Sequence, residues 1–156
     1  MSIEKQPQQA AIQNGHLACL RMHLQAENLH DMAGTLATLS PDCAFEDIPM
    51  GRRFDGHEGA REYYELWWSA LAVTVEGTDR SYWLNDSLFV SEAIYRGRHI
   101  GPFLGVAATG NAIRLPFVVF VSFTGGLFGG ERFYYDMATL LRQIGSSSTG
   151  SYGART

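Results

Sequence analysis

EGAREYYELWWSALA, residues 58–72, is the most strongly patterned segment of the chain and the one around which the other elements are expected to pack. Its apolar side chains recur at the i, i+3, i+4, i+7, i+8 and i+11 positions of one helix face. These positions hold Ala60, Tyr63, Tyr64, Trp67, Trp68 and Leu71. Two tryptophans on one face need a wide surface to receive them, and a concave sheet provides such a surface. We therefore expect a sheet that curves around this helix.

Downstream of residue 72 the hydrophobic pattern changes to the period of two that is typical of strands. We predict strands over residues 73–84, 88–99, 112–124 and 131–136. Turns are predicted at residues 85–86, in the loop 100–110 and at the glycine pairs 125–126 and 129–130. Residues 117–123 are largely apolar on both faces, so we expect this strand to be covered on both sides.

Upstream of the aromatic helix, two helical segments and one short strand are predicted. Residues 11–26 carry three leucines at helical spacing. A second helical segment follows over residues 29–39, and Pro41 ends it. Residues 43–48 then form a strand, and residues 49–56 form a turn that is rich in proline and glycine.

At the other end of the chain, residues 137–144 are predicted to form a short helix. Asp136 is its N-cap and Gly145 follows its last turn, positions at which helices prefer these residues. The predicted order is helix, helix, strand, helix and then consecutive strands. Meandering strands pair antiparallel, and segregated helices cover one face of such a sheet. The fold class is therefore α+β, with a cone-shaped, curved antiparallel sheet wrapped around helices.

The composition fits one domain with one core, because 46% of the 156 residues are hydrophobic and 18% are charged. We expect a single domain over residues 1–145 and a Gly/Ser-rich tail over residues 146–156. The net charge is −4 and no stretch gathers basic residues, which argues against nucleic acid as a partner. No apolar run approaches the ~20 residues of a membrane helix, and the N-terminus lacks a signal-peptide core. We therefore expect no membrane partner and a cytoplasmic protein.

Neither a metal ion nor an organic cofactor is indicated by the sequence. Cys19 and Cys43 form no CxxC motif. His16, His23 and His30 are spaced so that neighbours lie roughly 10.5 Å apart along a helix, too far for one ion with ligands at ~2.0 Å. The chain contains no HExxH, GxGxxG, GK[ST] or GxSxG motif.

Carboxylates and one histidine remain as candidates for catalysis. Asp47 is either a solvated residue before a turn or an inward carboxylate in apolar surroundings, where a raised pKa suits proton abstraction. Asp136 is either only a helix cap or a cap whose second oxygen acts as a base. His99 is either a core histidine or a base or oxyanion stabiliser close to Asp136. Tyr64 and Tyr134 are candidate hydroxyl donors.

Two segments resemble the SnoaL-like polyketide cyclases, within the nuclear transport factor 2-like superfamily. The first, HIGPFLGVAATG at residues 99–110, is similar to the H-x-G-x-x-x-G-x-x-x-T-G stretch of that family. The second, YDMATLLRQIG at residues 135–145, is similar to its Y-D-x-x-x-L-x-x-Q-L-G ending. Residues 45–59 also resemble the strand–turn–helix entry of the wider superfamily. Together these segments span most of residues 11–145.

This resemblance implies a cystatin-like α+β barrel with a deep pocket, often dimeric or larger. It implies an intramolecular aldol closure of a polyketide ring without metal or cofactor. Asp136 matches the carboxylate that the cyclases use as base, and His99 matches a family histidine. In the related ketosteroid isomerases the base stands at the place of Asp47, a tyrosine at that of His23 and an acid at about that of Val119.

We therefore expect a cofactor-independent enzyme that acts on a small hydrophobic carbonyl compound by general acid/base proton transfer, as a homodimer or higher homo-oligomer. The alternatives are a non-catalytic small-molecule-binding or oligomerisation module of the same fold, and an enzyme that directs water onto an epoxide. The expected catalytic residues are Asp136, His99 and Asp47. The side chains expected to bind the substrate are Phe45, Tyr64, Trp67, Trp68, Tyr95, Phe103, Phe117, Val119 and Tyr134.

Overall fold

The computed structural model describes residues 7–145. The elements along this part of the chain are α1 (Pro7–Asn28), α2 (Met32–Ala37), β1 (Leu39–Asp47), β2 (Arg52–Asp55), α3 (Gly56–Leu71), β3 (Thr74–Asn85), β4 (Leu88–Arg98), β5 (Ala112–Thr124), β6 (Leu127–Tyr135) and α4 (Met137–Gln143). The predicted α+β class is confirmed. The predicted tail over residues 146–156 lies outside the described residues. Within residues 7–145, no helix is both long enough and apolar enough to cross a membrane.

The strands form one curved sheet in the order β2-β1-β6-β5-β4-β3. β3 to β6 pair antiparallel as a meander, and β2 pairs antiparallel with β1. β1 and β6 pair in parallel, a departure from the antiparallel pattern that the sequence predicts. The long connection through α3 and the meander permits this parallel pairing, because no tight turn has to join β1 to β6. The sheet is open, with β2 and β3 at its edges, rather than closed into a barrel.

The short strand β2 falls where the sequence predicts only a turn. Its four residues include one apolar side chain, Phe54, so no alternation of apolar and polar residues marks the segment. Phe54 is 2% exposed and packs edge-on against Tyr63, with 5.4 Å between the ring centroids. A single buried side chain therefore anchors β2 to the core.

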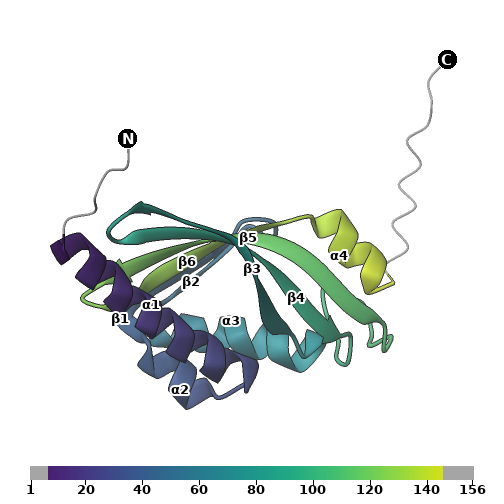
Figure 1. Ribbon diagram of the computed structural model, residues 1–156. Helices are drawn as coiled ribbons and strands as arrows, with labels where there is room; N and C mark the ends of the chain where they lie inside the picture. The colour runs from purple at the N-terminus through teal and green to yellow at the C-terminus, as the bar shows by residue number, and fades with distance from the viewer. Residues whose placement is uncertain (1–6, 146–156) are drawn as a thin grey trace.

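The sheet arches over three of the helices (Figure 1). α1, α2 and α3 lie on its concave side, and α4 lies against β5. The face of α3 that the sequence predicts as apolar is buried, since Tyr63, Tyr64 and Trp67 are each 1% exposed. Trp67 stacks on Tyr95 of β4, and Tyr63 stacks on Phe133 of β6. The prediction that a curved sheet receives this helix face is thus confirmed.

β4 approaches the end of α3 very closely at Gly97. A Cβ atom at this position would lie 2.2 Å from the carbonyl oxygen of Leu71. Just beyond β4, the backbone amides of Ile100 and Gly101 donate to the carbonyl oxygen of Ala70 at 2.8 and 3.0 Å. Glycine at position 97 therefore lets the end of β4 dock on the last turn of α3.

We predict that Gly97→Ala lowers the free energy of unfolding by about 1–3 kcal/mol, because the added methyl group meets a backbone oxygen that moves only if α3 moves. Gly77→Ala is the matched control, since Gly77 also lies in a strand and a Cβ atom there meets nothing within 4 Å. Urea denaturation followed by tryptophan fluorescence measures both variants. Equal stability of the two would contradict the close approach of β4 to α3.

Candidate active site

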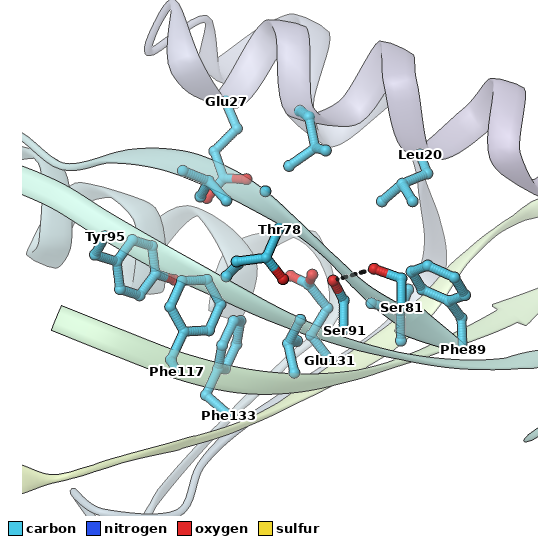
Figure 2. Close-up of a pocket in the computed structure, with 16 residues that line it drawn as sticks. Leu20, Glu27, Thr78, Ser81, Phe89, Ser91, Tyr95, Phe117, Glu131 and Phe133 are labelled. Atoms are coloured by element: carbon cyan, nitrogen blue, oxygen red, sulfur yellow. Dashed lines mark hydrogen bonds between the residues drawn. The ribbon is translucent and has the colours of Figure 1, made fainter. Parts of the chain in front are cut away.

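A cavity of about 200 Å³ lies between α1 and the concave face of the sheet. Figure 2 shows α1 above it and the strands below it. Its apolar lining consists of Leu20, Leu24, Val75, Phe89, Ala93, Phe117, Val119, Val121 and Phe133. Concave sites with mostly apolar walls and few polar groups are typical of small-molecule binding.

Two carboxylic acids interrupt this apolar lining. Glu27 projects from α1 and Glu131 from β6, so they enter the cavity from opposite sides (Figure 2). Glu27 is 7% exposed, and burial raises its pKa to about 8. Glu131 is half-buried as a residue, and the desolvation of its carboxyl group, followed by the charge of Glu27, holds its pKa well above its usual range. The pKa of about 8 keeps Glu27 mainly protonated at neutral pH, and the raised pKa of Glu131 favours its neutral form as well.

Behind the two acids, a chain of hydrogen bonds determines the state of His23. The Thr38 hydroxyl donates to the carbonyl oxygen of Thr35 at 2.6 Å, so it accepts the hydrogen of His23 Nδ1 at 2.7 Å. His23 Nε2 then carries no hydrogen and accepts from the Tyr64 hydroxyl at 2.9 Å. Burial lowers the pKa of His23 to about 3, in agreement with this neutral form.

Tyr64 connects this chain to Glu131. Its oxygen lies 2.9 Å from His23 Nε2 and 3.4 Å from Glu131 Oε2. One hydroxyl hydrogen serves one acceptor well, so it points to His23 while Glu131 is protonated and can turn to Glu131 when that carboxyl ionises. His23 Nε2 also lies 3.7 Å from Glu27 Oε2. This is a contact between neutral groups, because burial disfavours the charged form of each partner.

Asp136, one of the predicted catalytic residues, lies away from the cavity. Its carboxylate caps α4 and accepts from the backbone amides of Ala138 and Thr139 at 3.1 and 3.2 Å. The side chain is 63% exposed, and the hydrogen bond from the Thr139 hydroxyl holds the pKa of Asp136 below its usual value. The predicted N-cap is confirmed, and the structure does not bring this carboxylate to the cavity.

His99 is fully buried but is not part of the cavity lining. Its Nδ1 accepts from the backbone amide of Thr109 at 3.3 Å and lies 3.0 Å from the Thr109 hydroxyl. Backbone hydrogen bonds link His99 to Gly110 and Asn111, which closes the loop between β4 and β5. In the part of the chain that the structure describes, His99 Nε2 has no hydrogen-bond partner. The structure places this histidine in a loop closure, outside the cavity lining.

Asp47 is buried on the inner face of β1, again outside the cavity lining. The Tyr135 hydroxyl donates to its two oxygens at 2.9 and 3.1 Å, and the backbone amide of Met50 donates at 3.0 Å. Burial raises the pKa of Asp47, and these hydrogen bonds oppose the shift. The carboxyl group therefore has its own partners within the fold.

Three of the predicted substrate-binding residues line the cavity, namely Tyr95, Phe117 and Val119. Tyr64 lies behind the lining and reaches it through Glu131. Tyr134 points to the opposite face of the sheet, where it is 40% exposed. The remaining four are buried but do not line the cavity: Phe45, Trp67, Trp68 and Phe103.

Glu27 and Glu131 were not predicted as site residues, although the sequence holds a signal for each. Glu27 follows Leu20 at i+7 and Leu24 at i+3, so it occupies the apolar face of its helix. Glu131 alternates with Phe133 on the inner face of β6. An acid at a position where the pattern calls for an apolar residue is uncommon, because burying a carboxyl group is costly.

The cysteines and the other histidines contribute to packing. Cys19 and Cys43 are buried free thiols. His16 and His30 stack on aromatic rings, with centroid distances of 4.3 and 4.7 Å. Within residues 7–145, no three histidine, cysteine or carboxylate side chains are grouped so that they could hold a metal ion.

Known proteins match both the sequence and the fold of this chain. The family model of the SnoaL-like polyketide cyclases matches residues 17–144. The chain belongs to this family. The resemblance carried by residues 99–110 and 135–145 is thus confirmed. No curated protein matches the chain.

Several solved structures share the fold of this SnoaL-like protein. A proposed SnoaL-like polyketide cyclase from a Jannaschia species has a TM-score of 0.78 at 17% identity, over 94% of this chain and 99% of its own. A proposed polyketide cyclase from a Silicibacter species has a TM-score of 0.73 at 21% identity, over 83% and 95%. A protein with a ketosteroid isomerase-like fold from Catenulispora acidiphila, in complex with trimethylamine, has a TM-score of 0.69 at 17% identity, over 81% and 92%. At these identities the likeness shows the fold alone.

We predict that the free energy of unfolding of this SnoaL-like protein falls as the pH rises from 6.5 to 8. Unfolded Glu27, with its ordinary pKa of 4.5, is ionised throughout this range, whereas folded Glu27 keeps its proton up to a pKa of about 8. The folded state therefore binds more protons, and stability falls with rising pH. At about 1.36 kcal/mol per pH unit, the loss from Glu27 is on the order of 2 kcal/mol. Glu131 acts in the same direction.

Urea denaturation at the two pH values measures this effect. Glu27→Gln has no carboxyl proton to release. The free energy of unfolding of this variant should therefore fall less between pH 6.5 and pH 8 than that of the unmodified protein. Glu65→Gln, at an exposed position of α3, is the control and should keep the full fall. If Glu27→Gln retained the pH dependence of the unmodified protein, Glu27 would have to be ionised in the folded state at neutral pH.

Proposed function

We propose that this protein is a cofactor-independent cytoplasmic enzyme that transfers a proton at the carbon next to the carbonyl group of a small hydrophobic compound. Aldol cyclisation of a polyketide and isomerisation of an unsaturated ketone both begin with this step. The observation that carries the proposal is the pair of neutral acids, Glu27 and Glu131, facing one otherwise apolar cavity. Membership of the SnoaL-like polyketide cyclase family supports this class of reaction.

Glu131 is the proposed base. Once the pair has lost one proton, the remaining proton can reside on either carboxyl group, and the form with the proton on Glu27 carries its charge on Glu131. In this form the Glu131 carboxylate removes the hydrogen from the α carbon, and the electrons of the C–H bond pass to the carbonyl oxygen to form an enolate. The Tyr64 hydroxyl, 3.4 Å from Glu131 Oε2, is within reach to stabilise the carboxylate form. A base is most effective when its pKa lies near the pH at which the enzyme works, because it is then partly ionised and still binds a proton strongly. The raised pKa values of the pair favour this condition.

Glu27 is the proposed acid. His23 Nε2, 3.7 Å from Glu27 Oε2, presents a lone pair rather than a hydrogen, which favours a protonated Glu27. Two carboxylates also resist ionising together in a cavity of low polarity. The Glu27 O–H is thus available to the enolate oxygen, where negative charge develops. In an aldol closure the enolate carbon attacks a second carbonyl carbon, and the alkoxide that forms takes up the proton that Glu131 removed. In an isomerisation the conjugated enolate takes this proton back from Glu131 at a different carbon.

The cavity limits the size of the substrate. An apolar cavity of about 150 Å³ holds benzene. The cavity of about 200 Å³ therefore suits one ring with a short side chain, or a linear diketone of similar bulk. The Ser81 and Ser91 hydroxyls, 2.8 Å apart, add a polar strip on β3 and β4 (Figure 2). A neutral ketone matches these walls better than a charged ligand does.

Exchange of the α-hydrogens of ketones in D₂O, followed by proton NMR, tests the proposal. The panel is acetophenone, cyclohexanone and benzoylacetone. We expect the unmodified protein to accelerate exchange, and to do so more at pH 8 than at pH 6.5 because more of the pair is ionised at pH 8. Glu131→Gln should slow exchange by about 10²–10⁴-fold, since one positioned base contributes this much. Glu27→Gln, which keeps a hydrogen-bond donor, should slow it less.

Asp136→Asn and Glu65→Gln are the controls for this measurement, because both side chains are exposed and outside the cavity. If Asp136→Asn lost exchange while Glu131→Gln kept it, the base would be Asp136, at the N-cap of α4, and not Glu131. Saturable ketone binding without any exchange would favour the alternative function, a binding module of the same fold.

We also propose that the protein forms a homodimer through the outer face of its sheet. Val118, Phe120 and Tyr134 lie on this face and are only partly covered. Contiguous exposed apolar surface of this kind favours association. Light scattering coupled to size-exclusion chromatography should give twice the mass of one chain, and Phe120→Lys should shift the protein toward the monomer. The mass of a single chain at micromolar concentration would contradict the proposal.

A further inference from the structure

Two buried tyrosine hydroxyls lie against each other beside the cavity. Tyr63 of α3 and Tyr95 of β4 are 1% and 2% exposed, and their oxygens are 3.2 Å apart. Two hydroxyl groups carry two hydrogens, and the contact between them uses only one. Over residues 7–145, neither oxygen has a second hydrogen-bond partner. One O–H donor is therefore unused inside the protein, which is uncommon because buried donors are normally paired.

The cavity identifies which of the two donors is unused. Tyr95 lines the cavity, and Tyr63 does not. The ring of Tyr63 is surrounded by other aromatic rings, those of Phe45, Phe54, Phe133, Tyr64 and Trp67. Of these only Tyr64 carries an acceptor oxygen, and its hydrogen bonds run to His23 and Glu131. The Tyr63 hydrogen therefore goes to the Tyr95 oxygen. The hydrogen of Tyr95 is then left for a group that occupies the cavity.

The surroundings of Tyr95 hold this donor in place. Its ring lies between Trp67 and Phe117, with centroid distances of 5.0 and 4.1 Å and interplanar angles of 26° and 17°. Burial raises the pKa of both tyrosines well above the usual range, so both keep their hydrogens at neutral pH. A donor that is already positioned needs little reorganisation when charge develops on its acceptor.

We propose that Tyr95 donates a hydrogen bond to the carbonyl oxygen of the ligand, with Tyr63 as the positioning residue that donates to Tyr95 in turn. This inference rests on the proposed function for the class of ligand. The hydrogen bond draws electron density from the α carbon and, together with the Glu27 O–H, stabilises the enolate oxygen. It also orients the ligand, with its oxygen toward Tyr95 and its α carbon toward Glu131.

Infrared difference spectroscopy of acetophenone, labelled with ¹³C at the carbonyl carbon, tests this contact without any turnover. When it is bound to the unmodified protein, the carbonyl band should lie at a lower frequency than in hexane, because a hydrogen bond weakens the C=O bond. Tyr95→Phe should reduce this shift to the part that the Glu27 O–H contributes, and weaken binding about threefold to tenfold. Tyr63→Phe should keep most of the shift, since Tyr95 retains its hydroxyl. Tyr82→Phe, at a position of β3 that is 62% exposed, is the matched control and should change nothing.

An unchanged carbonyl band in Tyr95→Phe would overturn the inference, and so would the absence of saturable acetophenone binding to the unmodified protein. Circular dichroism verifies that each variant is folded. Tyr95→Met, which also lacks the hydroxyl, takes the place of Tyr95→Phe if the latter does not fold.

The exchange measurement separates this inference from the proposed function. Tyr95→Phe should slow α-hydrogen exchange by about 10²-fold while affinity changes far less, because the donor acts mainly on the developing enolate. A shifted band that depends on Tyr95 but comes without exchange would leave the role of Tyr95 intact and refute the proposed function. Exchange at an unchanged rate in Tyr95→Phe would refute the role of Tyr95 and leave the proposed function intact.

Discussion

The stacking of Trp67 on Tyr95 confines any ligand to one part of the concave face of the sheet. α3 fills the space beneath its part of the concave face with large aromatic rings, which pack as densely as the interior of any protein. α1 crosses the same face with smaller side chains, Leu20 and Leu24, and the cavity lies between them and the strands. The position of the cavity therefore depends on how the side chains of α1 and α3 differ in size. α3 carries aromatic residues at its buried positions, whereas α1 presents the partly buried Leu20 and Leu24 and one buried acid, Glu27, to the cavity.

That acid and its partner on β6 reduce stability, which makes them informative about function. A buried carboxyl group costs free energy in its neutral form unless it is fully hydrogen-bonded, and far more when it is ionised. Glu27 faces an unprotonated His23 Nε2, and Glu131 has a single long contact with Tyr64. Replacing buried charged pairs by apolar residues of similar volume is often neutral or stabilising in other proteins, so neither acid is needed to hold the fold together. Proteins retain such costly groups mainly where a ligand needs them, and this supports acid and base roles for the pair.

Local sequence patterns were sufficient to predict every element except β2, but they pointed to only part of the cavity lining. The helix over residues 58–72 and the strand over residues 112–124 each carry their own periodicity, and the structure matches them closely. The inner face of β6 was not evident, because the strand begins earlier than predicted and its pairing with β5 shifts register around the glycine pair. The predicted residue Asp136 lies just beyond the end of this strand, whereas Glu131 points inward. The burial of Glu27 depends likewise on how α1 lies over the sheet, which a helical pattern does not contain.

The motifs that revealed the family hold the fold together, and neither of them supplies a residue of the cavity lining. In the first motif, Thr109 fixes the ring of His99 and closes the loop after β4. In the second, the Gln143 side chain bonds to both backbone groups of Arg114, at 3.0 and 2.7 Å, and fastens α4 to β5. Motifs of this kind identify the framework, while the chemistry depends on what that framework buries. A carboxyl group on an apolar face is the better guide to a base, because the desolvation that raises its pKa is also what brings the pKa close to the working pH.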